Sequence, residues 1–301
     1  MSSGALAGYR LASTLARRIP EGAGRPLARA AGRLVGRLDS PRRRQVGRHV
    51  RRVQGADLPP TALRRATGRV FASYADYWYR SLRLPAMDTA ELGRRFSIDG
   101  YRHLEEARTV GPGPILALPH LGTWDWAGLW LARVKRVPVS AVAERLNPPE
   151  LFEWFRELRA ALGIEVIPLG EGAGTQVLRS VAEGRVVCLL SDRLVGGSGV
   201  DVEFFGETTR LPAGPATLAL RSGASLLPAG VYDTPDGCHA IVRPPVPAER
   251  TGRLRDDVTR MTTALAIELE WLIGRAPDQW HLVQPNWPTD RVAIERAAAD
   301  R

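Results

Sequence analysis

Apolar and polar positions along the chain follow two different periods, which indicates a mixed α/β protein. From residue 111 onward, short apolar runs alternate with segments in which apolar residues recur every three or four positions. The runs predict buried strands at residues 115–118, 137–142, 164–167, 186–190, 200–205, 225–231 and 239–242. The segments between them predict helices from residue 123, at residues 149–162, 174–183 and 214–222, and finally a long helix around residues 258–272.

Alternating strands and helices imply the α/β fold class, with a central, largely parallel sheet and helices on both faces. Upstream, the chain has helical periodicity only, in a basic segment at residues 25–38 and in a segment with an aromatic stripe at residues 61–82. We therefore expect an α/β domain at residues 61–301, preceded by a helical N-terminal extension at residues 1–60.

The N-terminal extension carries nearly all of the net charge of +10. Residues 1–56 contain thirteen arginines against only Glu21 and Asp39, whereas the rest of the chain is close to neutral. In residues 25–38 the arginines recur every four positions and the leucines lie on the opposite side, so this helix is amphipathic. Such a helix either lies on an anionic membrane surface or packs its leucines on the protein's own core. Nucleic-acid binding is not expected, because no aromatic residues are interleaved with the arginines.

Several function classes are disfavoured by composition and spacing. No stretch reaches the roughly 20 uninterrupted apolar residues of a membrane span, and the N-terminus lacks the apolar block of a secretory signal, so we expect a cytoplasmic location. The five histidines and two cysteines show no metal-ligand spacing, so no metal site is expected. Gly197-Ser198-Gly199 lacks the spacing of a nucleophile elbow, which argues against a serine hydrolase.

His120 is the strongest candidate for chemistry. It lies directly after the apolar strand at residues 115–118, and Asp125 follows five positions later in the first turn of the next helix. A carboxylate that binds one imidazole nitrogen leaves the other nitrogen free to take a proton from a hydroxyl group. The alternative is that both residues serve only the packing of the turn.

Four sequence blocks in a fixed order carry a resemblance to a known family. They are His120-x4-Asp125, residues 143–148 (AERLNP), residues 200–216 (VDVEFFGETTRLPAGPA) and residues 277–281 (PDQWH). Together they resemble the bacterial lipid acyltransferases that include the lipid A lauroyl/myristoyl transferases, and among these the actinobacterial acyltransferases of phosphatidylinositol mannosides. The similarity extends over about residues 74–287.

The resemblance implies a glycerolipid-acyltransferase-like fold and a specific reaction. A long acyl chain, palmitoyl by preference, is transferred from acyl-CoA to the 6-hydroxyl of a mannose on a phosphatidylinositol mannoside. His120 is implied as the general base and Asp125 as its orienting partner, with direct attack on the thioester. Acyl-CoA is then a co-substrate, no cofactor is expected, and the enzyme works as a peripheral protein at the cytoplasmic face of the cell membrane.

The resemblance also implies charged substrate-binding residues. Asp192 stands where the family commonly has glutamate, so we expect its contact to sugar hydroxyls to shift or to pass through water. From the residues alone, a buried Glu144 beside an arginine is more typical of an ion pair that shapes a cleft. These candidates are Glu144, Arg145, Arg159, Asp192 and Arg193.

Three further substrate-binding candidates lie in residues 204–210. Gly206 follows two aromatic residues and would let a ligand approach the backbone at Phe205 and Gly206, and Arg210 precedes a helix N-terminus that suits a phosphate. The alternative is a bulge at a sheet edge with Arg210 in solvent. Two alternative functions also stay open: the same reaction on another glycolipid, lysophospholipid or hydroxyl acceptor, and a non-enzymatic lipid-binding protein with this fold.

Overall fold

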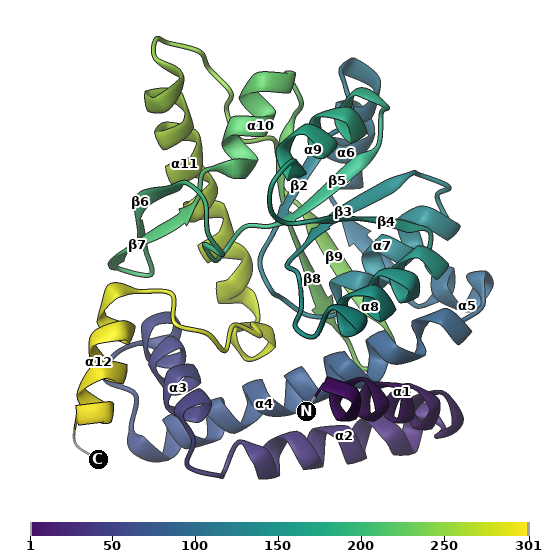
Figure 1. The fold of residues 1–301 in the computed structure, drawn as a ribbon, viewed down its shortest axis with the longest axis vertical. Coiled ribbons are helices and arrows are strands. Elements are labelled where there is room, and N and C mark those ends of the chain that lie inside the picture. Colours follow the sequence, from purple (N-terminus) through teal and green to yellow (C-terminus); the bar gives the residue numbers. More distant parts are fainter. Residues whose placement is uncertain (1, 300–301) are drawn as a thin grey trace.

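A seven-stranded sheet forms the centre of the computed structural model, which describes residues 2–299 (Figure 1). The strand order is β1-β9-β8-β2-β5-β3-β4, and all neighbouring strands are parallel except β8 and β9. The largely parallel α/β sheet predicted from the sequence is therefore confirmed. The strands are β1 (Phe96–Asp99), β2 (Ile115–Leu118), β3 (Val139–Ala143), β4 (Ile164–Pro168), β5 (Val186–Leu190), β8 (Leu226–Asp233) and β9 (Cys238–Val242).

Helices cover both faces of the sheet, because the central strands are apolar on both sides. All four side chains of β2 are buried. Ile115 and Ala117 belong to a core cluster with α9 (Ala173–Ala182), α10 (Gly214–Ser222) and α11 (Leu254–Arg275). Leu116 and Leu118 belong to a second cluster with α5 (Thr89–Arg94), α6 (Tyr101–Val110) and α7 (Trp124–Arg133). The two-residue period of the strand thus divides the core into two layers.

The N-terminal part of the chain folds into four helices, which lie along the lower side of Figure 1. They are α1 (Ser2–Arg18), α2 (Glu21–Val35), α3 (Pro41–Gln54) and α4 (Pro60–Arg83). The helix expected at residues 61–82 is confirmed as α4, whereas the basic helix expected at residues 25–38 begins and ends earlier, as α2. A side chain at Gly32 would meet the backbone oxygen of Phe71 at 2.3 Å, so glycine is needed where α2 crosses α4.

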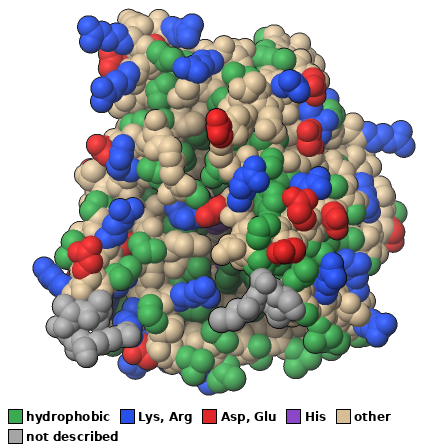
Figure 2. All heavy atoms as spheres, in the orientation of Figure 1, with side chains coloured by type: hydrophobic (Ala, Val, Ile, Leu, Met, Phe, Trp, Pro, Cys, Tyr) green, Lys and Arg blue, Asp and Glu red, His purple; other side chains and the backbone are tan. Residues whose placement is uncertain are grey.

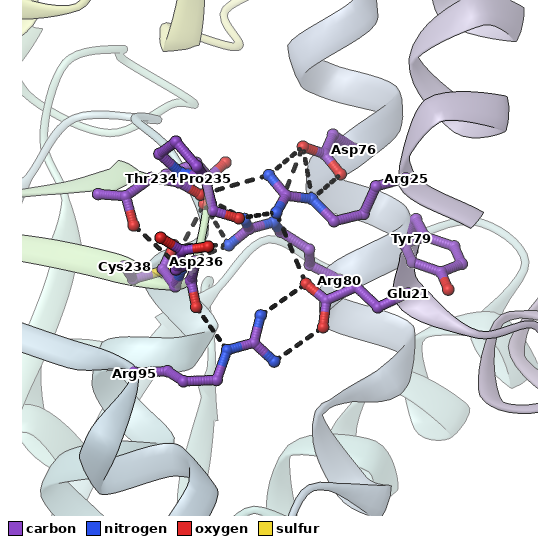
Figure 3. A network of polar contacts seen from close by, with 12 residues as sticks. Glu21, Arg25, Asp76, Tyr79, Arg80, Arg95, Thr234, Pro235, Asp236 and Cys238 are labelled. Atoms are coloured by element: carbon purple, nitrogen blue, oxygen red, sulfur yellow. Dashed lines mark hydrogen bonds and ion pairs between the residues drawn. The ribbon is translucent and has the colours of Figure 1, made fainter. Parts of the chain in front are cut away.

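A network of ion pairs joins the N-terminal helices to the sheet (Figure 3). Asp76 on α4 is fully buried and pairs with Arg25 of α2 at 3.2 Å. Arg80 donates to two backbone carbonyl oxygens of the β8–β9 turn, each at 2.8 Å. Arg95 binds both carboxylate oxygens of Glu21 at 2.7 and 2.8 Å. The division of the chain at residue 60 into two domains stays a prediction, and these contacts cross it.

Residues 199–212 form an antiparallel hairpin of β6 (Gly199–Phe204) and β7 (Glu207–Pro212), outside the central sheet. Phe205 and Gly206 are the two turn residues, with φ of 53° and 72°. Two consecutive residues with positive φ are typical of a tight hairpin turn whose twist matches that of the strands. The run at residues 200–205 was therefore correctly expected to be extended, but it does not join the main sheet.

Four further helical segments complete the fold among the described residues. They are a short 3₁₀ turn at Leu84–Ala86, α8 (Pro149–Ala161), which packs beside β4, the 3₁₀ turn at Pro277–Gln279, and α12 (Pro288–Ala299). The chain between the 3₁₀ turn at Pro277–Gln279 and α12 returns to the carboxyl end of β2, where Leu121 and Trp280 form a single β-bridge. This return brings the C-terminal segment to the edge of the sheet at which His120 lies.

Candidate active site

His120 and Asp192 meet at the carboxyl edge of the sheet. β2 and β5 are parallel neighbours with Leu118 beside Leu190, and each chain continues for two residues to reach His120 and Asp192. The Nδ1 atom of His120 lies 2.7 Å from Oδ1 of Asp192, and the backbone N–H of His120 donates to Oδ2 at 3.0 Å. This is the edge of a parallel sheet at which α/β proteins place their ligands.

The Asp192 carboxylate is fully buried and charged. Burial alone raises the pKa of Asp192, but the positive charge of His120 and hydrogen bonds from His120 and Trp280 outweigh it and lower the pKa below its ordinary value. A charged carboxylate accepts, so Nδ1 of His120 carries the proton and donates. Nε2 is then the nitrogen available to accept a proton from a ligand.

The predicted pairing of His120 with Asp125 is wrong. Asp125 is buried and accepts hydrogen bonds from Nε of Arg159 at 3.0 Å, from the hydroxyl of Tyr77 at 3.2 Å and from that of Ser81 at 3.4 Å. The physical reason is that the first turn of α7 presents Asp125 to α4 and α8, whereas His120 turns towards the neighbouring strand β5. Asp192, expected to bind substrate, takes the place predicted for Asp125.

The partners of Asp125 are fixed in their protonation states. Burial and the negative charge of Asp125 raise the pKa of Tyr77 well above its ordinary value, so its hydroxyl stays a donor. Burial lowers the pKa of Arg159, but Asp125 and Tyr77 outweigh it and raise the pKa overall. The guanidinium also lies over the ring of Trp124, 4.8 Å from its centroid. Asp125 thus holds Arg159, which lines the cavity, from behind through an ion pair.

His120 opens onto a cavity of about 620 Å³, a volume typical of small-molecule sites. One part of the wall is aromatic and polar and comes from α4, α7, α8 and the C-terminal segment. The other part is small and apolar and comes from β3, β4, β5, α9 and α10. The aromatic part includes Tyr74, Trp78, Trp124 and Phe155, and the apolar part includes Val142, Val166, Ala173, Val177, Leu189, Ala213 and Leu218.

Charged side chains that follow β3 and β5 also line this cavity. Glu144 and Arg193 both line it, and Nη2 of Arg193 donates to Oε2 of Glu144 at 2.6 Å. Nε of Arg193 is buried and has no hydrogen-bond partner among the described residues. Arg145, in contrast, is exposed and does not line the cavity. The structure therefore brings Glu144, Arg159 and Arg193 to the cavity with His120 and places Arg145 outside it.

Phe205, Gly206 and Arg210 do not line this cavity, so their predicted contact with a ligand stays a prediction. Phe205 and Gly206 form the hairpin turn, and the Phe205 ring packs 5.9 Å from that of Trp280. Arg210 has a side chain that is 59% exposed and pairs with Asp201 at 3.2 Å. The structure thus places Arg210 in solvent, as the alternative expected, but on a separate hairpin and not on a bulge of the main sheet.

Sequence reasoning missed two site residues, Trp280 and His281. His281 lines the cavity between the rings of Tyr74 and Tyr77, and its Nε2 lies 2.9 Å from the hydroxyl of Ser73. Burial, followed by the positive charge of His120, lowers the pKa of His281 to about 3. Its backbone N–H donates to the carbonyl oxygen of His120 at 2.7 Å. The sequence feature that could have indicated them is the block at residues 277–281, because it places two aromatic side chains with N–H groups, Trp280 and His281, directly after α11.

Comparison with known proteins gives the family. The family model described as bacterial lipid A biosynthesis acyltransferase matches residues 9–289. The phosphatidylinositol mannoside acyltransferase of Mycolicibacterium smegmatis is 40% identical over 297 residues, which cover 97% of this chain and 93% of that protein. A protein of the same name from Mycobacterium tuberculosis is 38% identical over 287 residues, which cover 93% of this chain and 88% of that protein. The chain therefore belongs to the bacterial lipid A biosynthesis acyltransferase family.

Proposed function

We propose that this protein transfers a palmitoyl group from acyl-CoA to the 6-hydroxyl of a mannose on phosphatidylinositol mannosides. The observation that carries the proposal is the His120–Asp192 pair, which opens onto a cavity with one apolar and one polar aromatic part. The membership in an acyltransferase family and the printed names of the relatives support the reaction class and the acceptor.

In the proposed reaction, Nε2 of His120 takes the proton of the mannose hydroxyl while its oxygen attacks the thioester carbonyl carbon. The C–S bond then breaks, and the leaving CoA thiolate takes the proton from the imidazolium. Asp192 stabilises the imidazolium and holds Nδ1 protonated throughout. The acyl group passes directly to the acceptor, so the reaction needs no acyl-enzyme and no cofactor besides the acyl-CoA co-substrate.

The two parts of the cavity suit the two substrates. An acyl chain matches the apolar part between α9 and α10, because burial of each methylene group contributes about 0.8 kcal/mol. A sugar matches the aromatic rings of the other part, which offer flat apolar faces, and Glu144 in the cavity wall offers a carboxylate to its hydroxyl groups. His120 lines the cavity together with both sets of residues, as a base that acts between donor and acceptor requires.

The N-terminal helices are proposed to hold the enzyme peripherally on the cytoplasmic face of the cell membrane. Leu11, Leu27 and Leu34 are each about 60% exposed, and arginines lie on the same helices. Apolar and basic side chains gather along the lower edge of Figure 2, over α1 and α2. Tyr9 of α1 packs against Trp78 and Phe155 of the cavity wall. No helix among residues 2–299 is long and apolar enough to cross a membrane.

The test is release of CoA thiol from palmitoyl-CoA, with and without purified phosphatidylinositol mannosides, followed by mass spectrometry of the lipid. We expect wild type to add one palmitoyl group to the mannoside and His120→Ala to add none. His239→Ala is a matched control, because His239 lies on β9 and does not line the cavity. Release of CoA thiol without an acylated mannoside would overturn the assignment of phosphatidylinositol mannosides as the acceptor. Equal activity of wild type and His120→Ala would overturn the role of His120, and lipid binding without any transfer would favour a non-enzymatic binder.

A further inference from the structure

Within residues 2–299, Trp280 is the only side chain other than His120 that donates a hydrogen bond to the Asp192 carboxylate. Its Nε1 lies 2.7 Å from Oδ2 of Asp192. Trp280 is 3% exposed and Asp192 is fully buried, so water does not compete for this bond. Trp280 does not line the cavity, and it therefore acts on the reaction only through other residues.

The two oxygens of Asp192 have separate partners. Oδ2 accepts from the backbone N–H of His120 at 3.0 Å and from Trp280 at 2.7 Å, while Oδ1 faces Nδ1 of His120 at 2.7 Å. Two donors on one oxygen fix the plane of the carboxylate. A carboxylate in a fixed plane keeps Oδ1 within hydrogen-bond distance of Nδ1 of His120. Residues that hydrogen-bond to the ligands of a metal site orient those ligands in the same way.

The indole is itself held from several sides. Its backbone pairs with Leu121, beside His120. Its ring packs against His49 of α3, with centroids 5.4 Å apart, and against Phe205 at 5.9 Å. Nδ1 of His49 lies 3.0 Å from the carbonyl oxygen of Leu282, and its Nε2 lies 2.7 Å from Gln45. A side chain packed in this way holds its donor in place before substrate arrives, which is what preorganisation requires.

We infer that Trp280 is a positioning residue for acyl transfer: its indole N–H fixes the Asp192 carboxylate so that Oδ1 orients and supports His120. This inference rests on the proposed function, because it assumes that His120 is the base. Loss of the N–H leaves a buried carboxylate oxygen with one donor and lets the carboxylate turn away from the imidazole. We expect kcat to fall about tenfold or more, since a misplacement of about 1 Å can cost about a hundredfold. The KM for palmitoyl-CoA stays near that of wild type, because the cavity wall is unchanged.

The experiment compares Trp280→Phe with Trp287→Phe. Trp287 is a matched control: it is 1% exposed, it lies in the same aromatic cluster, and its Nε1 donates to the backbone oxygens of Phe204 and Glu207 at 3.1 and 3.3 Å. Both variants lose one buried indole N–H, but only Trp280→Phe takes it from Asp192. Replacement of Trp280 by 3-benzothienylalanine, in which sulfur replaces the N–H with nearly unchanged shape, keeps the packing if the phenylalanine variant folds poorly.

Two readouts are needed, kcat with KM and the NMR signal of the His120 Nδ1 proton in protein with ¹⁵N-labelled histidine. A short bond to a buried carboxylate shifts this proton far downfield, and a purely structural role of Trp280 would leave it unchanged. We expect the His120 Nδ1 proton signal to disappear or to shift upfield in both Trp280 variants. In Trp287→Phe we expect the signal to stay at its wild-type position. Equal kcat and an unchanged proton signal in the Trp280 variants would overturn the inference while His120-dependent transfer persists. Absence of His120-dependent transfer in wild type would instead overturn the proposed function, and the proton signal would still report on Trp280.

Discussion

At the scale of single residues, His281 is a buried neutral base beside a second histidine. The low pKa of His281, about 3 in the folded protein against 6.5 for an ordinary histidine, comes first from burial and then from the charge of His120. Between these two pH values the unfolded chain binds one proton more than the folded protein. The free energy of unfolding therefore falls as the pH falls through this window, by about 1.4 kcal/mol per pH unit from this residue.

This prediction is checked by urea unfolding of wild type and His281→Gln at pH 6, 5 and 4. We expect the variant to lose less stability than wild type on acidification, because glutamine does not titrate. His239→Gln serves as the control, since His239 lies at the strand edge and bonds to Ser97. Identical pH dependence of wild type and His281→Gln would show that His281 does not resist protonation in the folded state.

The pairing of His120 with Asp192 shows how far the contacts of single residues can be predicted from the sequence. Both residues lie two positions beyond strands that were correctly predicted at 115–118 and 186–190. The sequence patterns did not show which strands are neighbours in the sheet. β5 lies beside β2 in space, although β3 and β4 separate the two strands in the sequence. Proximity in sequence favoured Asp125 instead. Strand order is set by long-range packing, so a residue pair that depends on it is not visible in local patterns.

At the scale of elements, apolar runs and helical periodicity correctly predicted the positions of most strands and helices from residue 111 onward. The elements missed by pattern are those with little apolar content. β1 is an edge strand that contains Ser97 and Asp99, and every second residue of it is exposed. α3 is capped by Ser40, whose side chain accepts a hydrogen bond from the backbone N–H of Arg43, but the many arginines of α3 hide the apolar pattern of its buried residues Val46 and Val50. Edge position and a polar composition weaken the periodic signal even where the element is well formed.

The exposed face of α1 and α2 carries a prediction of its own. Leu27→Ser with Leu34→Ser removes two side chains that are 63% and 61% exposed, so stability changes little. We expect binding to vesicles of phosphatidylglycerol and phosphatidylcholine to weaken about tenfold or more, because each leucine buried in the interface contributes about 1–2 kcal/mol. Binding of wild type should also weaken with added salt, since the arginines of these helices attract anionic lipids.

Ile267→Ser is the control for this vesicle experiment. Ile267 on α11 is 63% exposed, like each of the two leucines, and lies on a different helix, so its replacement removes one comparably exposed apolar side chain away from α1 and α2. We expect it to bind vesicles like wild type. Equal binding by the Leu27/Leu34 variant and by wild type would mean that the exposed leucines of α2 do not contribute to membrane binding.

At the scale of the whole molecule, three distant parts of the chain converge on Asp192. β2 and β5 bring His120 and Asp192 together, and the C-terminal segment adds Trp280 and the Asn286 side chain, which donates to the Asp192 backbone oxygen at 2.9 Å. α3 of the N-terminal layer supports Trp280 through His49. The ion-pair network of Figure 3 and this cluster both tie the N-terminal helices to the sheet, so the helices proposed to meet the membrane belong to the same layer as α3, which packs beneath the His120–Asp192 pair through Trp280.

The most direct test of this account is the kcat of Asp192→Asn for palmitoyl transfer to phosphatidylinositol mannosides. Asparagine keeps the shape of Asp192 but removes the charge that supports the His120 imidazolium. We expect kcat to fall about a thousandfold or more, while Asp201→Asn, a 74% exposed control on the hairpin, retains wild-type rates. An Asp192→Asn enzyme that turns over within about tenfold of wild type would contradict the assignment of Asp192 and His120 as the reacting pair.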